Sequence, residues 1–165
     1  RGIVNYESEN VNISLPIFSI HGNHDDPTGD ARQSAMDVLA MSKFVNYFGK
    51  QTNVDELHIH PVLIQKGQIR LAIYGLGHIR DERLYRTMRD KSKVHFYRPD
   101  PIPGLEDGGW WSILMIHQNR PKRGNAKNYF DEVSGVGTTS FMNRFLDVSH
   151  FAAVGVLRVL MTTSP

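Results

Sequence analysis

Short apolar runs that end in polar turns organise this chain. Residues 16–20 predict a short buried strand that leads directly into a turn rich in Gly, Asn, His and Asp. Apolar runs at 59–64 and 69–74 flank Lys66-Gly67-Gln68, which is typical of a β-hairpin. Residues 110–116 are almost uninterrupted apolar sequence, which predicts a central strand covered on both faces.

Helical spacing follows the first polar turn. Residues 31–42 predict a helix capped by Thr28 or Asp30, because Met36, Leu39 and Ala40 recur on one stripe. Residues 43–48 then alternate in the manner of a strand. A helix and a strand are therefore expected soon after the turn.

Later segments give weaker signals. Residues 81–89 predict a short charged helix with Leu84 and Met88 facing inward, and residues 94–97 favour a strand. Beyond these, residues 141–148 could be helical and residues 151–161 are apolar enough for a strand. The mixture of strands and amphipathic helices indicates an α/β protein.

Composition narrows the class of protein. The chain has 165 residues, enough for one domain, and its 40% hydrophobic and 22% charged content is typical of soluble globular proteins. Its longest apolar run, 151–157, is far shorter than the ~20 residues that span a bilayer, so no membrane association is expected. The absence of cysteine excludes a disulfide framework and thiolate chemistry. A net charge of +2 does not by itself indicate a nucleic-acid partner.

Two polar turns carry candidate chemistry. Asn23 offers an amide oxygen to a divalent cation, and His24 offers an imidazole that transfers protons near neutral pH. His117 ends the predicted strand at 110–116, so it occupies the same kind of position at a strand tip. Taken singly, such residues are more often hydrogen-bonded turn or cap residues than ligands.

The motifs around these turns resemble a known family. His21-Gly22-Asn23-His24-Asp25 resembles the G-N-H-D/E signature of calcineurin-like metallophosphoesterases. From about Val4 to Gly124, the chain resembles the eukaryotic meiotic-recombination double-strand-break repair nuclease. The segments that carry this likeness are Asp26-Pro27-Thr28-Gly29, Phe44-Val45-Asn46-Tyr47-Phe48-Gly49, Tyr74-Gly75-Leu76-Gly77, Asp81-Glu82-Arg83-Leu84 and Ile116-His117-Gln118-Asn119-Arg120.

This resemblance implies a manganese-dependent exonuclease and endonuclease that acts on DNA ends in the nucleus. The family works as a homodimer with a coiled-coil ATPase subunit and nibrin. Asn23 and His117 correspond to ligands of a site for two Mn²⁺ ions. His24 corresponds to the residue that approaches the scissile phosphate and assists the leaving oxygen.

The family also implies an interface and a fold. Its dimers pack through a helix that follows the first turn, which makes Met36, Leu39 and Ala40 interface candidates, although packing in the monomer core explains their spacing equally well. The fold implied is a four-layer β-sandwich flanked by helices, incomplete at both ends here. Residues 1–165 would form a partial nuclease domain, in which residues 125–165 are a divergent tail.

Part of the family's metal shell has no counterpart in this sequence. No Asp-x-His occurs, and Ala153-Val154-Gly155-Val156 stands where Gly-His-x-His is expected. The chain begins at Arg1, so a piece of a longer product is expected, and by itself it is expected to have little or no nuclease activity. The alternatives are another metallophosphoesterase, such as a phosphatase or nucleotidase, or a non-catalytic form that keeps dimer or partner contacts.

Two further clusters have competing explanations. Arg120, Lys122 and Arg123 form a basic loop after His117 that either contacts the DNA backbone or is simply solvated. His58 and His60 point to one face of a predicted strand, where a solvent face or sheet edge is favoured over a metal site.

Overall fold

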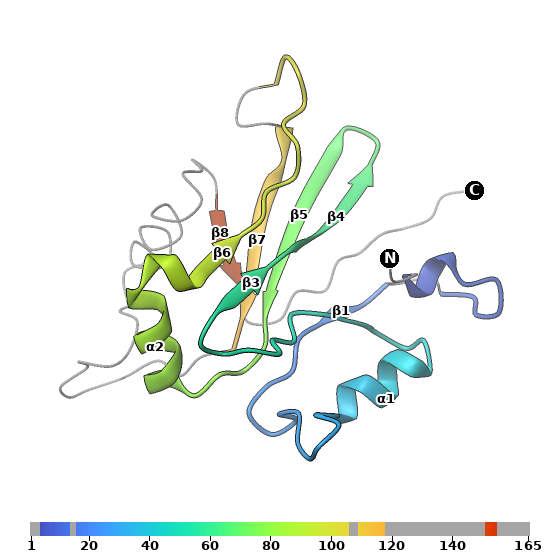
Figure 1. The fold of residues 1–165 in the computed structure, drawn as a ribbon. Coiled ribbons are helices and arrows are strands. Elements are labelled where there is room, and N and C mark those ends of the chain that lie inside the picture. The colour runs from blue at the N-terminus through green and yellow to red at the C-terminus, as the bar shows by residue number, and fades with distance from the viewer. Residues whose placement is uncertain (1–3, 14–15, 106–108, 118–150, 155–165) are drawn as a thin grey trace.

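The computed structural model describes residues 4–13, 16–105 and 109–117, together with the backbone of 151–154 (Figure 1). Within these residues the elements are η1 (Asn5–Glu7), β1 (Phe18–Ser19), α1 (Ala35–Met41), β2 (Asn46–Tyr47), β3 (Leu57–Ile59), β4 (Pro61–Lys66), β5 (Ile69–Leu76), α2 (Asp81–Arg89), η2 (Lys91–Lys93), β6 (Val94–Phe96), β7 (Trp111–Ile116) and β8 (Phe151–Val154).

The main sheet has the order β4-β5-β7-β8. Strands β4 and β5 are antiparallel and form the predicted hairpin, in which Gly67 takes the positive φ of 56° that the tight turn requires. Strands β5, β7 and β8 run parallel, so the predicted strand at 110–116 is central, as expected. The carboxyl ends of β5 and β7 therefore lie at the same edge of this sheet.

The predicted strand at 59–64 is divided between two sheets. Residues Leu57–Ile59 form β3, which pairs in parallel with β6, whereas β4 begins at Pro61 and pairs with β5. Proline cannot donate a backbone hydrogen bond, and the first position of a strand tolerates that loss. The chain therefore changes partner at His60, between the two strands.

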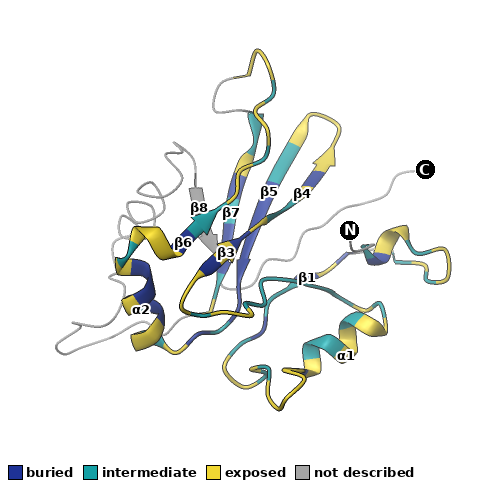
Figure 2. Ribbon diagram, viewed as in Figure 1, coloured by how far each residue is buried: buried dark blue, intermediate teal, exposed yellow. Residues whose placement is uncertain are grey.

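Both faces of the main sheet are covered within the described residues (Figure 2). Successive side chains of β5 point to opposite faces. On one face Tyr74 and Leu114 pack with β3, β6 and helix α2, from which Leu84 and Met88 point inward as predicted. On the other face Ile73 packs with β1 and β4. The β1–β2 pair is thus held against one face of the sheet, and α2 lies over the other.

Helix α1 begins later than predicted. Ser34, rather than Thr28 or Asp30, is its N-cap, and the Ser34 hydroxyl accepts a hydrogen bond from the Met36 amide at 3.1 Å. Residues 28–33 instead form a turn closed by backbone hydrogen bonds between Thr28 and Gln33. A true capping box is a stronger helix start than an isolated polar residue, which explains the shift.

Of the remaining predicted elements, some are present in the structure and others lie outside the described residues. Helix α2 and strand β6 lie where the sequence predicts them, while β2 is limited to Asn46–Tyr47 within the predicted strand at 43–48. Strand β8 covers the start of the apolar run at 151–161. The predicted helix at 141–148 and the boundary of the divergent tail at 125 lie outside the described residues.

The described elements form a mixed α/β fold with small sheets, which confirms the predicted α/β class. Among the residues that the structure describes, no helix has the length and apolar character that crossing a bilayer requires.

Candidate metal centre

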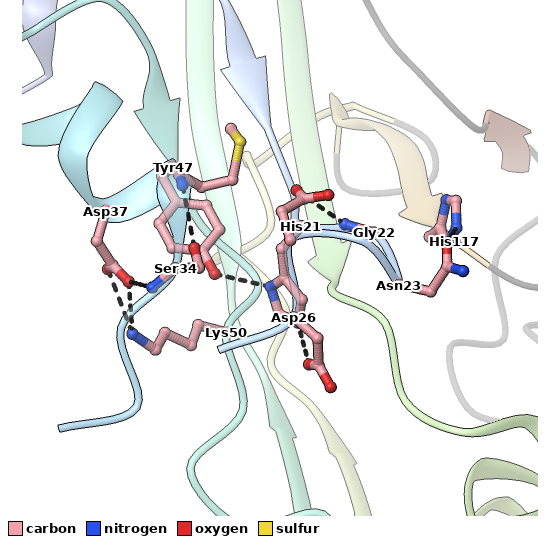
Figure 3. A network of polar contacts seen from close by, with 11 residues as sticks. His21, Gly22, Asn23, Asp26, Ser34, Asp37, Tyr47, Lys50 and His117 are labelled. Atoms are coloured by element: carbon pink, nitrogen blue, oxygen red, sulfur yellow. Dashed lines mark hydrogen bonds and ion pairs between the residues drawn. The ribbon is translucent and has the colours of Figure 1, made fainter. Parts of the chain in front are cut away.

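The turn after β1 meets the carboxyl end of β7. The Asn23 side-chain oxygen Oδ1 lies 3.0 Å from His117 Nε2, although the two residues are 94 positions apart in sequence (Figure 3). Both side chains are exposed to solvent. The tips of two distant strands thus bring an amide oxygen and an imidazole nitrogen together at the surface.

Glycine permits this close approach. A Cβ atom on Gly22 would lie 3.3 Å from two atoms of the His117 ring, which is tighter than ordinary contact. A Cβ atom on Gly77, at the end of β5, would overlap the His21 ring. The His21 carbonyl also accepts a hydrogen bond from the His78 amide at 3.0 Å, which holds the turn against β5.

The buried His21 side chain anchors the turn to the rest of the protein. It is only 4% exposed, and its Nδ1 lies 2.7 Å from the Tyr47 hydroxyl oxygen. Its Nε2 lies 3.7 Å from an Asp26 carboxylate oxygen, which can only accept a proton. The Nε2–H tautomer is therefore favoured, with the Tyr47 hydroxyl donating to Nδ1. Burial lowers the His21 pKa, opposed chiefly by the Asp26 charge, so the neutral ring is favoured.

A second polar network ties the start of helix α1 to Lys50, which follows β2. The Lys50 ammonium lies 2.9 Å from the Asp37 carboxylate, which also accepts a hydrogen bond from the Ser34 amide at 2.8 Å. Burial alone would raise the Asp37 pKa, but the hydrogen bonds from Lys50 and the Ser34 amide together hold this pKa below its ordinary value. The start of α1 is therefore fixed beside Tyr47 (Figure 3).

The imidazole of His78 also lies beside His117. The His78 and His117 ring centroids are 5.9 Å apart with the planes at 75°. The His78 Nδ1 atom is buried and has no hydrogen-bond partner among the described residues. His78 was not among the residues predicted from the sequence, yet it closely follows strand β5, and a position at a strand tip is the signal that identified His117.

Comparison with known proteins identifies the family. No protein-family model matches the chain. However, it is 48% identical over 145 residues to the double-strand break repair protein MRE11 of Mus musculus, covering 88% of this chain and 19% of that protein. The human MRE11 protein is 46% identical over the same length, and the repair protein mus-23 of Neurospora crassa is 47% identical over 116 residues, 70% of this chain and 15% of its own length.

The chain belongs to the MRE11 family of double-strand break repair proteins. This confirms the resemblance drawn from the motifs. The chain spans about a fifth of the length of these mouse and human relatives.

The site residues named from the sequence fall in three places. Asn23 and His117 are adjacent, and His24 follows Asn23 with its side chain exposed. The basic residues Arg120, Lys122 and Arg123 lie outside the described residues.

The interface candidates lie on α1. Met36 and Ala40 are partly exposed, and Leu39 is 40% exposed. No residue of α1 is buried, so packing in the monomer core does not account for the apolar stripe within the described structure.

The donor set fits a divalent cation in part. Metal bonds of roughly 2.1 Å put neighbouring octahedral ligands about 3.0 Å apart, and the Asn23 Oδ1 to His117 Nε2 distance is 3.0 Å. An amide oxygen and an imidazole nitrogen suit manganese and similar cations. Two donors are too few for a complete shell, so these residues can contribute to a metal site but cannot form one alone.

A cleft of about 320 Å³ adjoins the turn. It is lined by His21 and His78 together with the arginines Arg32, Arg80 and Arg83. The cleft adjoins the candidate metal centre through His78, whose ring lies against His117, and its lining also includes Asp26.

Proposed function

We propose that this chain supplies part of the catalytic site of a nuclease subunit that acts in DNA double-strand-break repair. Membership of the MRE11 family supports a role in double-strand-break repair. The proximity of Asn23 Oδ1 and His117 Nε2, 3.0 Å apart, is the single observation that supports a metal-dependent site at this turn.

In this proposal the ion is Mn²⁺, two per complete site, and its chemistry is to neutralise phosphate charge and activate water. Asn23 and His117 hold the metal. His21 stays neutral beneath the turn and keeps Asn23 in position through the backbone. His24, exposed next to Asn23, carries a proton to the departing oxygen of a phosphodiester.

A chimera tests the catalytic proposal. Residues 4–124 would replace the corresponding segment of the mouse relative, and cleavage of linear duplex DNA would be measured with Mn²⁺. We expect His24→Ala to lower kcat by about 10²–10⁴-fold, because a positioned proton donor contributes about that much. Manganese affinity, measured by calorimetry on the same variant, should stay unchanged.

Three results would count against this proposal. Equal cleavage by the chimera and its His24→Ala variant would remove His24 from the reaction. A preference for small phosphate monoesters over DNA would favour the phosphatase or nucleotidase alternative. Failure of the folded chimera to take up manganese would favour the non-catalytic alternative. Leu63→Ala, at an exposed residue of β4, serves as the control substitution.

The 165-residue chain by itself should show little or no cleavage of linear DNA, since neither Asp-x-His nor Gly-His-x-His occurs in it. Manganese-dependent cleavage by this chain that disappears in His24→Ala would contradict the expectation.

We also propose that α1 contributes to a homodimer. Its residues Met36, Leu39 and Ala40 are not buried against the described chain, and nearby Val38 and Met41 are 62% and 80% exposed. A second copy would cover this apolar surface. Leu39→Asp should weaken self-association at least ~10-fold in sedimentation, because it places a charge in an apolar contact. Leu63→Asp is the matched control, and equal weakening by both would refute the assignment.

The remaining family expectations belong to the same proposal. The described sheets would form part of a four-layer β-sandwich, and the protein would act in the nucleus on DNA with a coiled-coil ATPase subunit and nibrin. Arg120, Lys122 and Arg123 would contact DNA phosphates, so replacing one of them should lower the salt dependence of DNA binding.

A further inference from the structure

A cluster of potential metal ligands lies on the β3–β6 sheet, on different elements from Asn23 and His117. Glu56 directly precedes β3, His58 is within β3, and His95 is within β6. His58 and His95 are directly paired in the parallel register. Paired residues of neighbouring strands project from the same face, so the two imidazoles and the carboxylate share one surface.

The three ligand atoms are close together. A Glu56 carboxylate oxygen lies 3.4 Å from His58 Nε2 and 3.5 Å from His95 Nε2. The two imidazole rings are stacked with centroids 4.8 Å apart and planes at 18°. All three ligand atoms lie within 4.8 Å of one another. The carboxylate oxygen therefore faces both ring nitrogens at once.

The two distances from the Glu56 carboxylate are close to those of a zinc site. Bonds of about 2.0–2.1 Å to His and Glu place neighbouring tetrahedral ligands roughly 3.3–3.4 Å apart. The two carboxylate-to-imidazole distances are 3.4 and 3.5 Å. The nearly parallel rings must pivot for both lone pairs to converge, and the broad χ2 torsion of histidine makes that pivot easy.

Tyr97 orients one of these ligands, His58. The Tyr97 hydroxyl oxygen lies 2.8 Å from His58 Nδ1, and the Tyr97 amide donates to the Ile59 carbonyl at 3.0 Å. When Nδ1–H donates to the hydroxyl, the lone pair of His58 is on Nε2, which is the nitrogen that faces Glu56. Metal-binding histidines commonly have such a partner on the second nitrogen.

We propose that Glu56, His58 and His95 form a surface site for Zn²⁺. Two imidazoles and one carboxylate are a ligand set that zinc accepts, and the fourth position is open to water because all three side chains are solvent-exposed to a substantial degree. The ion joins β6 to β3, which are otherwise paired over three residues. This site is independent of the proposed nuclease function.

Zinc titration of the 165-residue chain tests the site. Calorimetry with ZnCl₂ should show binding that His95→Ala and His58→Ala each weaken by at least ~10-fold, since each removes a ligand. Tyr97→Phe should weaken it by about 10-fold, as loss of a second-layer partner does. Glu56→Gln should also weaken it, while Glu82→Gln, at an exposed glutamate of α2, should not.

One control separates this site from the candidate metal centre. His117→Ala should leave zinc affinity at the cluster unchanged, so loss of all zinc binding in that variant would overturn the proposal. Wild-type zinc affinity in folded His58→Ala and His95→Ala would also overturn it.

A measurement on the wild-type protein tests the site even if the alanine variants do not fold. Zinc should slow carbethoxylation of His58 and His95, followed by mass spectrometry, several-fold relative to exposed His60. Equal rates at all three histidines with and without zinc would refute the site.

Discussion

At the scale of single residues, His21 illustrates how a buried imidazole positions a surface site. Its ring fills the space that the missing Cβ of Gly77 leaves, and its carbonyl binds the amide of His78. These contacts place the turn so that Asn23 reaches His117. The exposed residues of the candidate site therefore depend on buried ones that take no part in the chemistry.

Tyr47→Phe tests this dependence. The substitution removes the hydroxyl that donates to His21 Nδ1 and leaves a buried nitrogen without a partner. We expect the free energy of unfolding to fall by about 1–3 kcal/mol, measured by urea denaturation. Tyr6→Phe, at a residue 38% exposed, is the control. Equal stability of the two variants would show that the Tyr47 hydroxyl does not support the turn.

At the scale of elements, α1 is held at its start rather than through its sides. Ser34 and Asp37 form a capping box, and Lys50 adds an ion pair to Asp37 from outside the helix. No α1 residue is buried. A helix of seven residues has little intrinsic stability in water, so these terminal contacts account for its position.

Ser34→Ala should destabilise the chain by about 1 kcal/mol, since the helix loses the acceptor for the Met36 amide. The shift of the urea midpoint measures the effect. Ser42→Ala, at the exposed carboxyl end of the same helix, is the matched control. A midpoint that moves equally in both variants would mean that the cap does not stabilise α1.

At the scale of the whole molecule, the main sheet is packed between two different layers. Helix α2 and the β3–β6 pair cover one face, and β1 with its partner covers the other. The parallel strands β5 and β7 end at one edge, where Gly77, His78 and His117 meet the turn from the covering layer. The candidate site thus lies where a covering layer contacts the end of the sheet.

Stability should depend on pH through the contact between these layers. Burial lowers the His21 pKa, against the opposing charges of Asp26 and Asp25 and the His78 carbonyl, while the charge of His78 adds to the lowering. The unfolded chain therefore binds a proton first as pH falls below about 6.5. We expect the urea midpoint to be constant above that pH and to fall below it, until the folded ring also protonates.

The His21→Gln variant should flatten this slope, and the same substitution at exposed His60 is the control. An unchanged slope in His21→Gln would assign the pH dependence to other groups.

The sequence alone determined the local features of this protein. Apolar periodicity and turn residues predicted the hairpin, the central strand and α2, and the His21–Asp25 motif identified the first polar turn and the family. These features are local because hydrogen bonding within a turn or helix involves neighbours in sequence.

Only the tertiary structure decided which distant side chains meet. The approach of Asn23 to His117, the orphaned His78 nitrogen beside them, and the pairing of His58 with His95 each join different strands. Pairing between parallel strands depends on how whole layers pack, and sequence spacing does not encode that packing locally.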